Sequence, residues 1–100
     1  MEYLNDNEMQ KLGMAVLLSR LSSQKKRVLG LLVVFADQDY GSDPPSQRRM
    51  GRSLGMRPEA IAETLVLLEE AGLVRIVKGA HLFDLAADQI LALPREGVET

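Results

Sequence analysis

The sequence has 100 residues, 46% of them hydrophobic, and a formal net charge of −2, which suits one domain around a single modest core. No window approaches the ~20 uncharged apolar residues of a transmembrane helix, and the polar N-terminus lacks the pattern of a secretion signal. Because cysteine is absent, disulfides and thiolate metal sites are excluded. We therefore expect a cytoplasmic protein without metal or other cofactor.

Charge is distributed unevenly along the chain. Residues 20–58 contain eight Lys or Arg and three Asp, a balance of +5, so the remaining residues together carry −7. A phosphate group responds to the local field and not to the average over the molecule. The central segment is therefore a candidate for contact with a polyanion, although the whole chain is slightly acidic.

The first predicted helix covers residues 6–21, and Asn5 with Glu8 has the spacing of a capping box at its start. Apolar residues recur along it at helical intervals and form one stripe. Two interpretations remain open: the stripe packs on its own domain, or residues 1–21 form a dimerisation arm. The residues assigned to the arm interface are Met9, Leu12, Val16, Leu17 and Leu21.

The second predicted helix covers residues 24–38, with Ser22 or Ser23 as its N-cap. Lys25 and Lys26 lie in its first turn, where cations oppose the helix dipole. The same cations, together with free N–H groups, suit an anion. The pair is either a solvated corner or a phosphate contact.

A loop over residues 39–45 leads into a short third helix that contains arginines and no acidic residue. Arg48 and Arg52 share one face because they are one turn apart. Gly55 ends this helix, and Gly51 supplies the small residue needed where it crosses the next helix at a steep angle.

The fourth helix starts at Pro58, which suits a first turn, and has Ile61 and Leu68 on one narrow arc. Gly72 ends it in a left-handed conformation, so that Leu73 folds back onto the last turn.

Two alternating segments, residues 74–78 and 81–85, predict a hairpin closed by a type II′ turn at Gly79-Ala80. His81 is interpreted as a surface hairpin residue, since no carboxylate or thiolate is spaced to share a metal with it. A brief helix over residues 86–93 follows, and residues 95–100 are expected to be disordered.

The segment Met50–Met56 (MGRSLGM) followed by Leu68–Val74 (LEEAGLV) resembles the winged helix-turn-helix of bacterial transcription regulators. The multiple-antibiotic-resistance and arsenic-repressor groups are the nearest in style, and the resemblance covers roughly residues 24–93. It implies a mainly α fold with a small β-hairpin (α+β), in which a winged helix-turn-helix domain over residues 22–94 follows the N-terminal helix.

The resemblance also implies a small DNA-binding regulator, a repressor, that binds double-stranded DNA. We favour a homodimer through the N-terminal helix, because regulators that read two-fold sites need a second copy. The residues expected at the DNA are Lys25, Lys26, Arg48, Arg49, Arg52, Arg57, Glu59, Ala60, Glu63, Thr64 and Lys78.

The fourth helix departs from the pattern of those regulators. Glu63 stands where a basic or neutral polar reader is common, and Glu59 lies on the same face. Exposed Val66 and Leu67 beside these acids resemble a protein-contact surface. The alternative is therefore an adaptor that binds a protein partner in a larger assembly through these four residues. No enzymatic constellation is present in the sequence, and we expect no catalytic activity.

Overall fold

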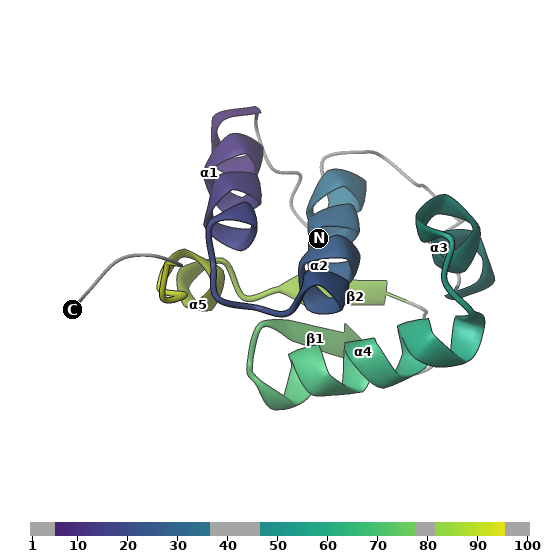
Figure 1. Ribbon diagram of the computed structural model, residues 1–100. Helices are drawn as coiled ribbons and strands as arrows, with labels where there is room; N and C mark the ends of the chain where they lie inside the picture. The colour runs from purple at the N-terminus through teal and green to yellow at the C-terminus, as the bar shows by residue number, and fades with distance from the viewer. Residues whose placement is uncertain (1–5, 37–46, 78–81, 96–100) are drawn as a thin grey trace.

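The computed structural model describes residues 6–36, 47–77 and 82–95, and it confirms a mainly helical fold with one antiparallel hairpin (Figure 1). The elements in chain order are α1 (Asp6–Leu17), α2 (Ser23–Ala36), α3 (Gln47–Leu54), α4 (Pro58–Glu70), β1 (Val74–Val77), β2 (Leu82–Leu85) and α5 (Ala87–Leu91). α2 lies at the centre, with α1 and α5 on one side and α3 on the other. α4 runs beneath α2 and packs directly on it, while β1 contacts α4 and β2 contacts α2.

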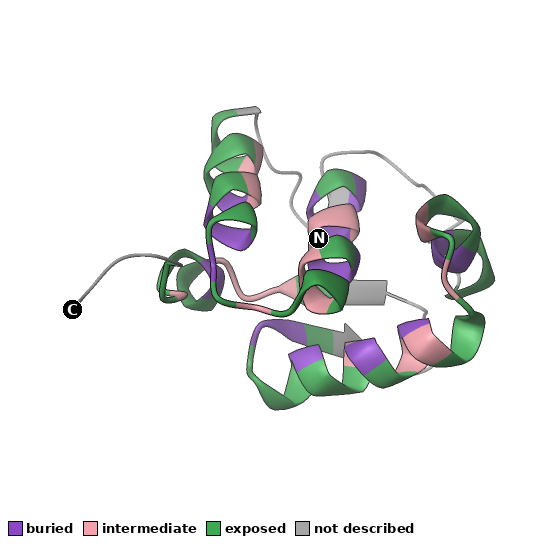
Figure 2. Ribbon diagram, in the orientation of Figure 1, coloured by how far each residue is buried: buried purple, intermediate pink, exposed green. Residues whose placement is uncertain are grey.

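Helix α1 packs on α2 and α5, and it belongs to the same core as the rest of the chain (Figure 2). Leu12 and Val16 are each only 2% exposed. Their assignment to a dimer interface is therefore wrong, because both are already buried within the single chain. Met9 and Leu21 are partly buried against that core, whereas Leu17 is 63% exposed.

Helix α1 is also shorter than predicted, because the chain turns at Ser19. The Ser19 hydroxyl donates to the carbonyl of Val16 at 2.6 Å and accepts the N–H of Leu21 at 3.3 Å. Ser19 then forms an isolated β-bridge with Arg95, and the N–H of Arg20 donates to the carbonyl of Pro94. Arg95 is thus part of the fold, which corrects its assignment to a disordered tail.

Helix α2 begins at Ser23, one residue earlier than predicted, and its N-cap is Ser22. The Ser22 hydroxyl accepts the N–H of Lys25 at 3.3 Å, which satisfies one of the free donors of the first turn. Val28 and Leu32 are almost fully buried, so α2 forms the centre of the core as its apolar pattern predicts.

The turn between α3 and α4 has the predicted chemistry. Gly55 adopts a φ of +66°, and the N–H of Met56 donates to the carbonyl of Gly51 at 2.8 Å, which closes the end of α3. A Cβ atom at Gly51 would overlap the carbonyl oxygen of Met56, so only glycine fits where the two helices approach. Pro58 occupies the first turn of α4.

Helix α4 ends in the same way, at Gly72 with a φ of +76°. The N–H of Leu73 donates to the carbonyl of Leu68 at 3.0 Å, and the Leu73 side chain is buried. This sharp reversal sends the chain into β1, which pairs with β2 from Val74 opposite Leu85 to Val77 opposite Leu82.

The closing helix α5 is shorter than the predicted range of residues 86–93, and its Ile90 is fully buried in the core. Several predicted features lie outside the described residues. These are the cap at Asn5, the end of the second helix at Gln38, the loop at 39–45, Lys78, the hairpin turn, His81 and the tail beyond Arg95.

Candidate nucleic-acid interface

Helix α3 presents a basic outer face. Arg48, Arg49 and Arg52 are exposed on it, whereas Met50 is buried and turns inward. Arg57 is exposed at the N-cap of α4, directly after the turn. We call these four arginines the basic ridge; they are exposed on α3 and on the turn that follows it.

The ridge keeps most of its charge available. Within residues 6–36, 47–77 and 82–95, the side chains of Arg48, Arg52 and Arg57 form no ion pair or hydrogen bond. The guanidinium carbon of Arg49 lies 6.0 Å from the centroid of the Phe35 ring, which is within cation–π range. This interaction holds the Arg49 side chain against α2. Unpaired guanidinium groups are well suited to phosphate, because their planar donors match its oxygens.

A second link ties the turn of the motif to α2. The Nη2 of Arg27 donates to the carbonyl of Leu54, the last residue of α3. The bond satisfies a carbonyl at the negative end of the α3 dipole, where a cation is favourable. Sequence reasoning missed this role, since the acceptor is a main-chain group 27 residues away and carries no signature in the sequence.

The N-terminus of α2 is partly capped by the protein itself. Lys25 and Lys26 are half-buried there, and the N–H of Lys25 already donates to Ser22. Less of this site is therefore available to an anion than the charge pattern alone suggests. In contrast, no side chain caps the N-terminus of α4, where Arg57 is extended at φ −70° and ψ 147°.

Thr64 does not lie on the outer face of α4, and its expected place at the DNA is wrong. The side chain is 1% exposed. Its hydroxyl donates to the carbonyl of Ala60 at 2.7 Å and accepts a hydrogen bond from Nε2 of Gln24 at 2.8 Å. Both bonding partners lie within the protein, so Thr64 positions α4 against α2. Gln24 is a structural partner of Thr64 that the sequence does not indicate.

The outer face of α4 is acidic and aliphatic. Glu59 and Glu63 are exposed, Ala60 is half-buried, and Val66 and Leu67 are 51% and 46% exposed. The helix contains four glutamates and no basic residue. The helix-turn-helix thus combines a basic α3 with an acidic α4, and the only polar side chains exposed on the first two turns of α4 are carboxylates.

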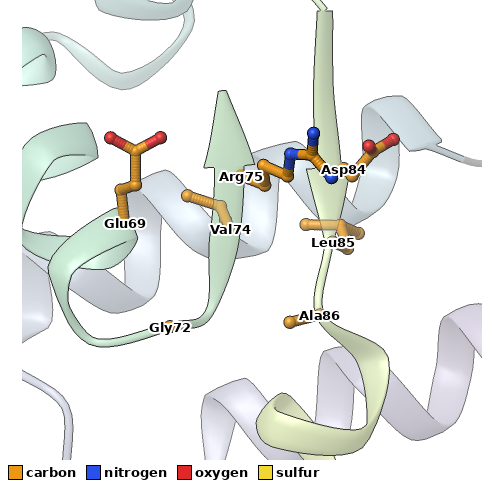
Figure 3. A pocket seen from close by; sticks show the side chains of 7 residues that line it. All are labelled: Glu69, Gly72, Val74, Arg75, Asp84, Leu85 and Ala86. Atoms are coloured by element: carbon orange, nitrogen blue, oxygen red, sulfur yellow. The ribbon is translucent and has the colours of Figure 1, made fainter. Parts of the chain in front are cut away.

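One shallow hollow lies between the end of α4 and the hairpin (Figure 3). Arg75 on β1 stands directly opposite Asp84 on β2, and Glu69 of α4 lines the same hollow.

Over the described ranges, no group of three or more His, Cys, Asp or Glu side chains is placed to hold a metal ion. Nor is any helix within those ranges long and apolar enough to cross a membrane.

Comparison with protein families identifies a match. The model of the LexA DNA-binding domain family matches residues 18–81, which include α2, the helix-turn-helix and β1. No curated protein and no solved structure matches the chain. The family match supports a winged helix-turn-helix, but it gives no support to the narrower likeness to the multiple-antibiotic-resistance and arsenic-repressor groups. Since the match spans more than half of its length, the chain belongs to the LexA DNA-binding domain family and is a DNA-binding helix-turn-helix domain.

Proposed function

We propose that the protein is a transcriptional repressor that binds duplex DNA through phosphate contacts of the basic ridge, with the first turns of α4 against the major groove. The observation that carries this proposal is the absence of internal partners for Arg48, Arg52 and Arg57 among the described residues. Three exposed cations on consecutive elements create a local positive field that a polyanion neutralises.

The family match names DNA as the ligand, and the residues at the DNA are our assignment. Thr64 is not among the proposed DNA contacts, because its side chain is buried. The proposed contacts are Lys25, Lys26, Arg48, Arg49, Arg52, Arg57, Glu59, Ala60, Glu63 and Lys78.

The side chains proposed to contact base edges are two carboxylates. Glu59 and Glu63 can accept a hydrogen bond from the amino group of cytosine in the major groove. They also bring negative charge towards the phosphates, so part of the attraction of the ridge is lost. We therefore propose binding that is weighted towards phosphate contacts and shows modest base discrimination.

Salt dependence tests the phosphate contacts. Arg48→Ala and Arg52→Ala should each weaken binding to every duplex and lower the slope of log K against log salt by about 1. Lys11→Ala is the matched control, because Lys11 is exposed on α1, away from α3. An unchanged slope in both ridge variants would remove the ridge from the DNA contact.

We also propose a homodimer, with a revised interface. Met14 and Leu17 are exposed on the C-terminal part of α1, and Leu18 is exposed directly after its end. Leu91 is 50% exposed on α5, which packs against α1. At physiological salt, Leu17→Glu should abolish the dimer in sedimentation, whereas Val34→Glu, at an aliphatic side chain exposed on α2, should not. A dimer that survives Leu17→Glu contradicts this interface.

A specific observation favours a second function, the protein adaptor. Val66 and Leu67 are about half exposed beside Glu59 and Glu63, on a helix without any basic residue. Such a face suits a basic partner with an aliphatic contact. Glu63→Arg should abolish capture of that partner while leaving DNA affinity equal or higher. Loss of DNA binding alone would exclude the adaptor.

A further inference from the structure

The two helices of the motif carry complementary charges on exposed faces. Arg48 and Arg52 of α3 form no ion pair within the part of the chain that the structure describes, and α3 has no acidic residue. Glu59 and Glu63 of α4 are also exposed and without an ionic partner there, and α4 has no basic residue. The charges of one helix are therefore not neutralised by the other within one chain.

The spacing of the two sets matches. Arg48 and Arg52 are four residues apart, as are Glu59 and Glu63, so each pair spans about 6 Å along its helix on one face. Two helices laid side by side can thus bring two arginines opposite two glutamates without a change in backbone.

The aliphatic part of α4 suits the same partner. Val66 and Leu67 are 51% and 46% exposed, one turn beyond Glu63. Arginine carries a long methylene stem that covers apolar surface while the guanidinium stays with a carboxylate or with water. An arginine-bearing helix therefore complements both the acidic and the aliphatic part of this face.

We propose that the outer face of α4 docks α3 of a second copy of this chain. Because each copy carries both helices, one two-fold arrangement places α3 of each copy on α4 of the other, and the contact is self-complementary. Exposed ion pairs are individually weak and are screened beyond about 10 Å at 0.1 M salt. We therefore expect the association at low salt and high protein concentration.

This contact covers the basic ridge, and it gives the protein an inactive state if the ridge binds DNA as proposed above. Duplex DNA competes for Arg48 and Arg52, so it dissociates the self-associated form by mass action. The inactive state rests on the proposed function, whereas the self-association rests only on the two charged faces.

A charge-exchange experiment tests the contact without DNA. The experiment is done in the Leu17→Glu background, which removes the homodimer proposed above and keeps native α3 and α4. Arg52→Glu and Glu63→Arg should each show at least a tenfold weaker self-association than this background in low-salt sedimentation equilibrium. When the two variants are mixed, each mixed dimer contains two α3–α4 contacts. In one contact, the glutamate introduced by Arg52→Glu faces the arginine introduced by Glu63→Arg. In the other contact, native Arg52 faces native Glu63. Association in the mixture should therefore return to the level of the Leu17→Glu background.

Lys11→Glu on α1 and Asp88→Arg on α5 change the net charge by the same amounts at exposed sites outside both faces. In the same Leu17→Glu background they should leave self-association within about twofold of that background, and their mixture should show no gain. Circular dichroism confirms that each variant is folded. If the mixture of Arg52→Glu and Glu63→Arg stays as weakly associated as its components, the α3–α4 contact is wrong.

DNA binding is measured separately on the same variants. Loss of DNA affinity in Arg52→Glu without recovery of association in the mixture overturns this inference and leaves the proposed function standing. Recovery of association with unaltered DNA affinity in Arg52→Glu supports the contact and removes this arginine from the DNA interface.

Discussion

The amide of Gln24 donates to the hydroxyl of Thr64 at 2.8 Å, and this hydrogen bond joins the first turn of α2 to the middle of α4. The same hydroxyl donates to the carbonyl of Ala60 at 2.7 Å. Thr64 is 1% exposed, so its polar group is satisfied entirely inside the protein. The bond fixes the orientation of α4 on α2, and it therefore determines which face of α4 is exposed to solvent.

Thr64→Val should destabilise the fold and leave base preference unchanged. Valine keeps the shape of threonine but removes the acceptor of the exposed Gln24 amide, so the expected loss is the net value of a hydrogen bond, about 0.5–1.5 kcal/mol. Urea denaturation measures the loss, and binding to base-substituted duplexes measures the preference. Thr64→Ser, which keeps the hydroxyl, should retain the hydrogen bond to Gln24. A change in base preference in Thr64→Val would return the hydroxyl to the DNA interface.

Glycine is required at one crossing point and is dispensable in α1. A Cβ atom at Gly51 would overlap the main-chain oxygen of Met56, so Gly51→Ala should cost about 1–3 kcal/mol and weaken DNA binding by disturbing the α3–α4 angle. A Cβ atom at Gly13 meets nothing within 4 Å, and Gly13→Ala should stabilise the protein by up to about 1 kcal/mol. Thermal unfolding of both variants is the measurement, and equal effects would contradict the close approach.

The helix-turn-helix was predictable because its signals are local. Gly51, Gly55, Pro58 and Gly72 mark the crossing and the helix ends, and each has the conformation or contact that its position requires. An amphipathic stripe, by contrast, does not say which surface covers it. The stripe of α1 packs on its own chain, and this followed from tertiary contacts alone.

The burial of Thr64 did have a signal in the sequence. Ile61, Thr64 and Leu68 are separated by three and four residues, the interval that places side chains on one helical face. The chemistry of threonine favours a DNA contact, whereas the periodicity of its own helix predicts burial. The bond between Arg27 and Leu54 had no such signal, since a main-chain acceptor can be contributed by any residue.

Arg27→Gln should loosen the turn between α3 and α4. Its guanidinium donates to the carbonyl of Leu54 at an exposed site, so the expected loss of stability is only about 1 kcal/mol. The local effect should be larger: the amide of Met56, which closes the end of α3, should exchange faster with solvent. Arg27→Lys keeps the charge and should restore part of the protection. Unchanged exchange at Met56 in Arg27→Gln would show that the bond does not stabilise the turn.

Two leucines of α1 separate its role in the core from its role at a surface. Leu12 is 2% exposed, so Leu12→Ala should destabilise the monomer by about 2–5 kcal/mol through lost burial and a cavity. Leu17 is 63% exposed, so Leu17→Ala should change stability by less than about 0.5 kcal/mol. Chemical denaturation at low protein concentration measures both without a contribution from association.

Removal of residues 1–21 should accordingly unfold or strongly destabilise the chain instead of yielding a folded monomer, because the deletion removes Leu12, Ala15 and Val16 from the core. Circular dichroism of the truncated chain decides between these outcomes. A truncated chain with native helicity and a cooperative transition would show that α2–α5 form a complete core, and that α1 is an accessory element after all.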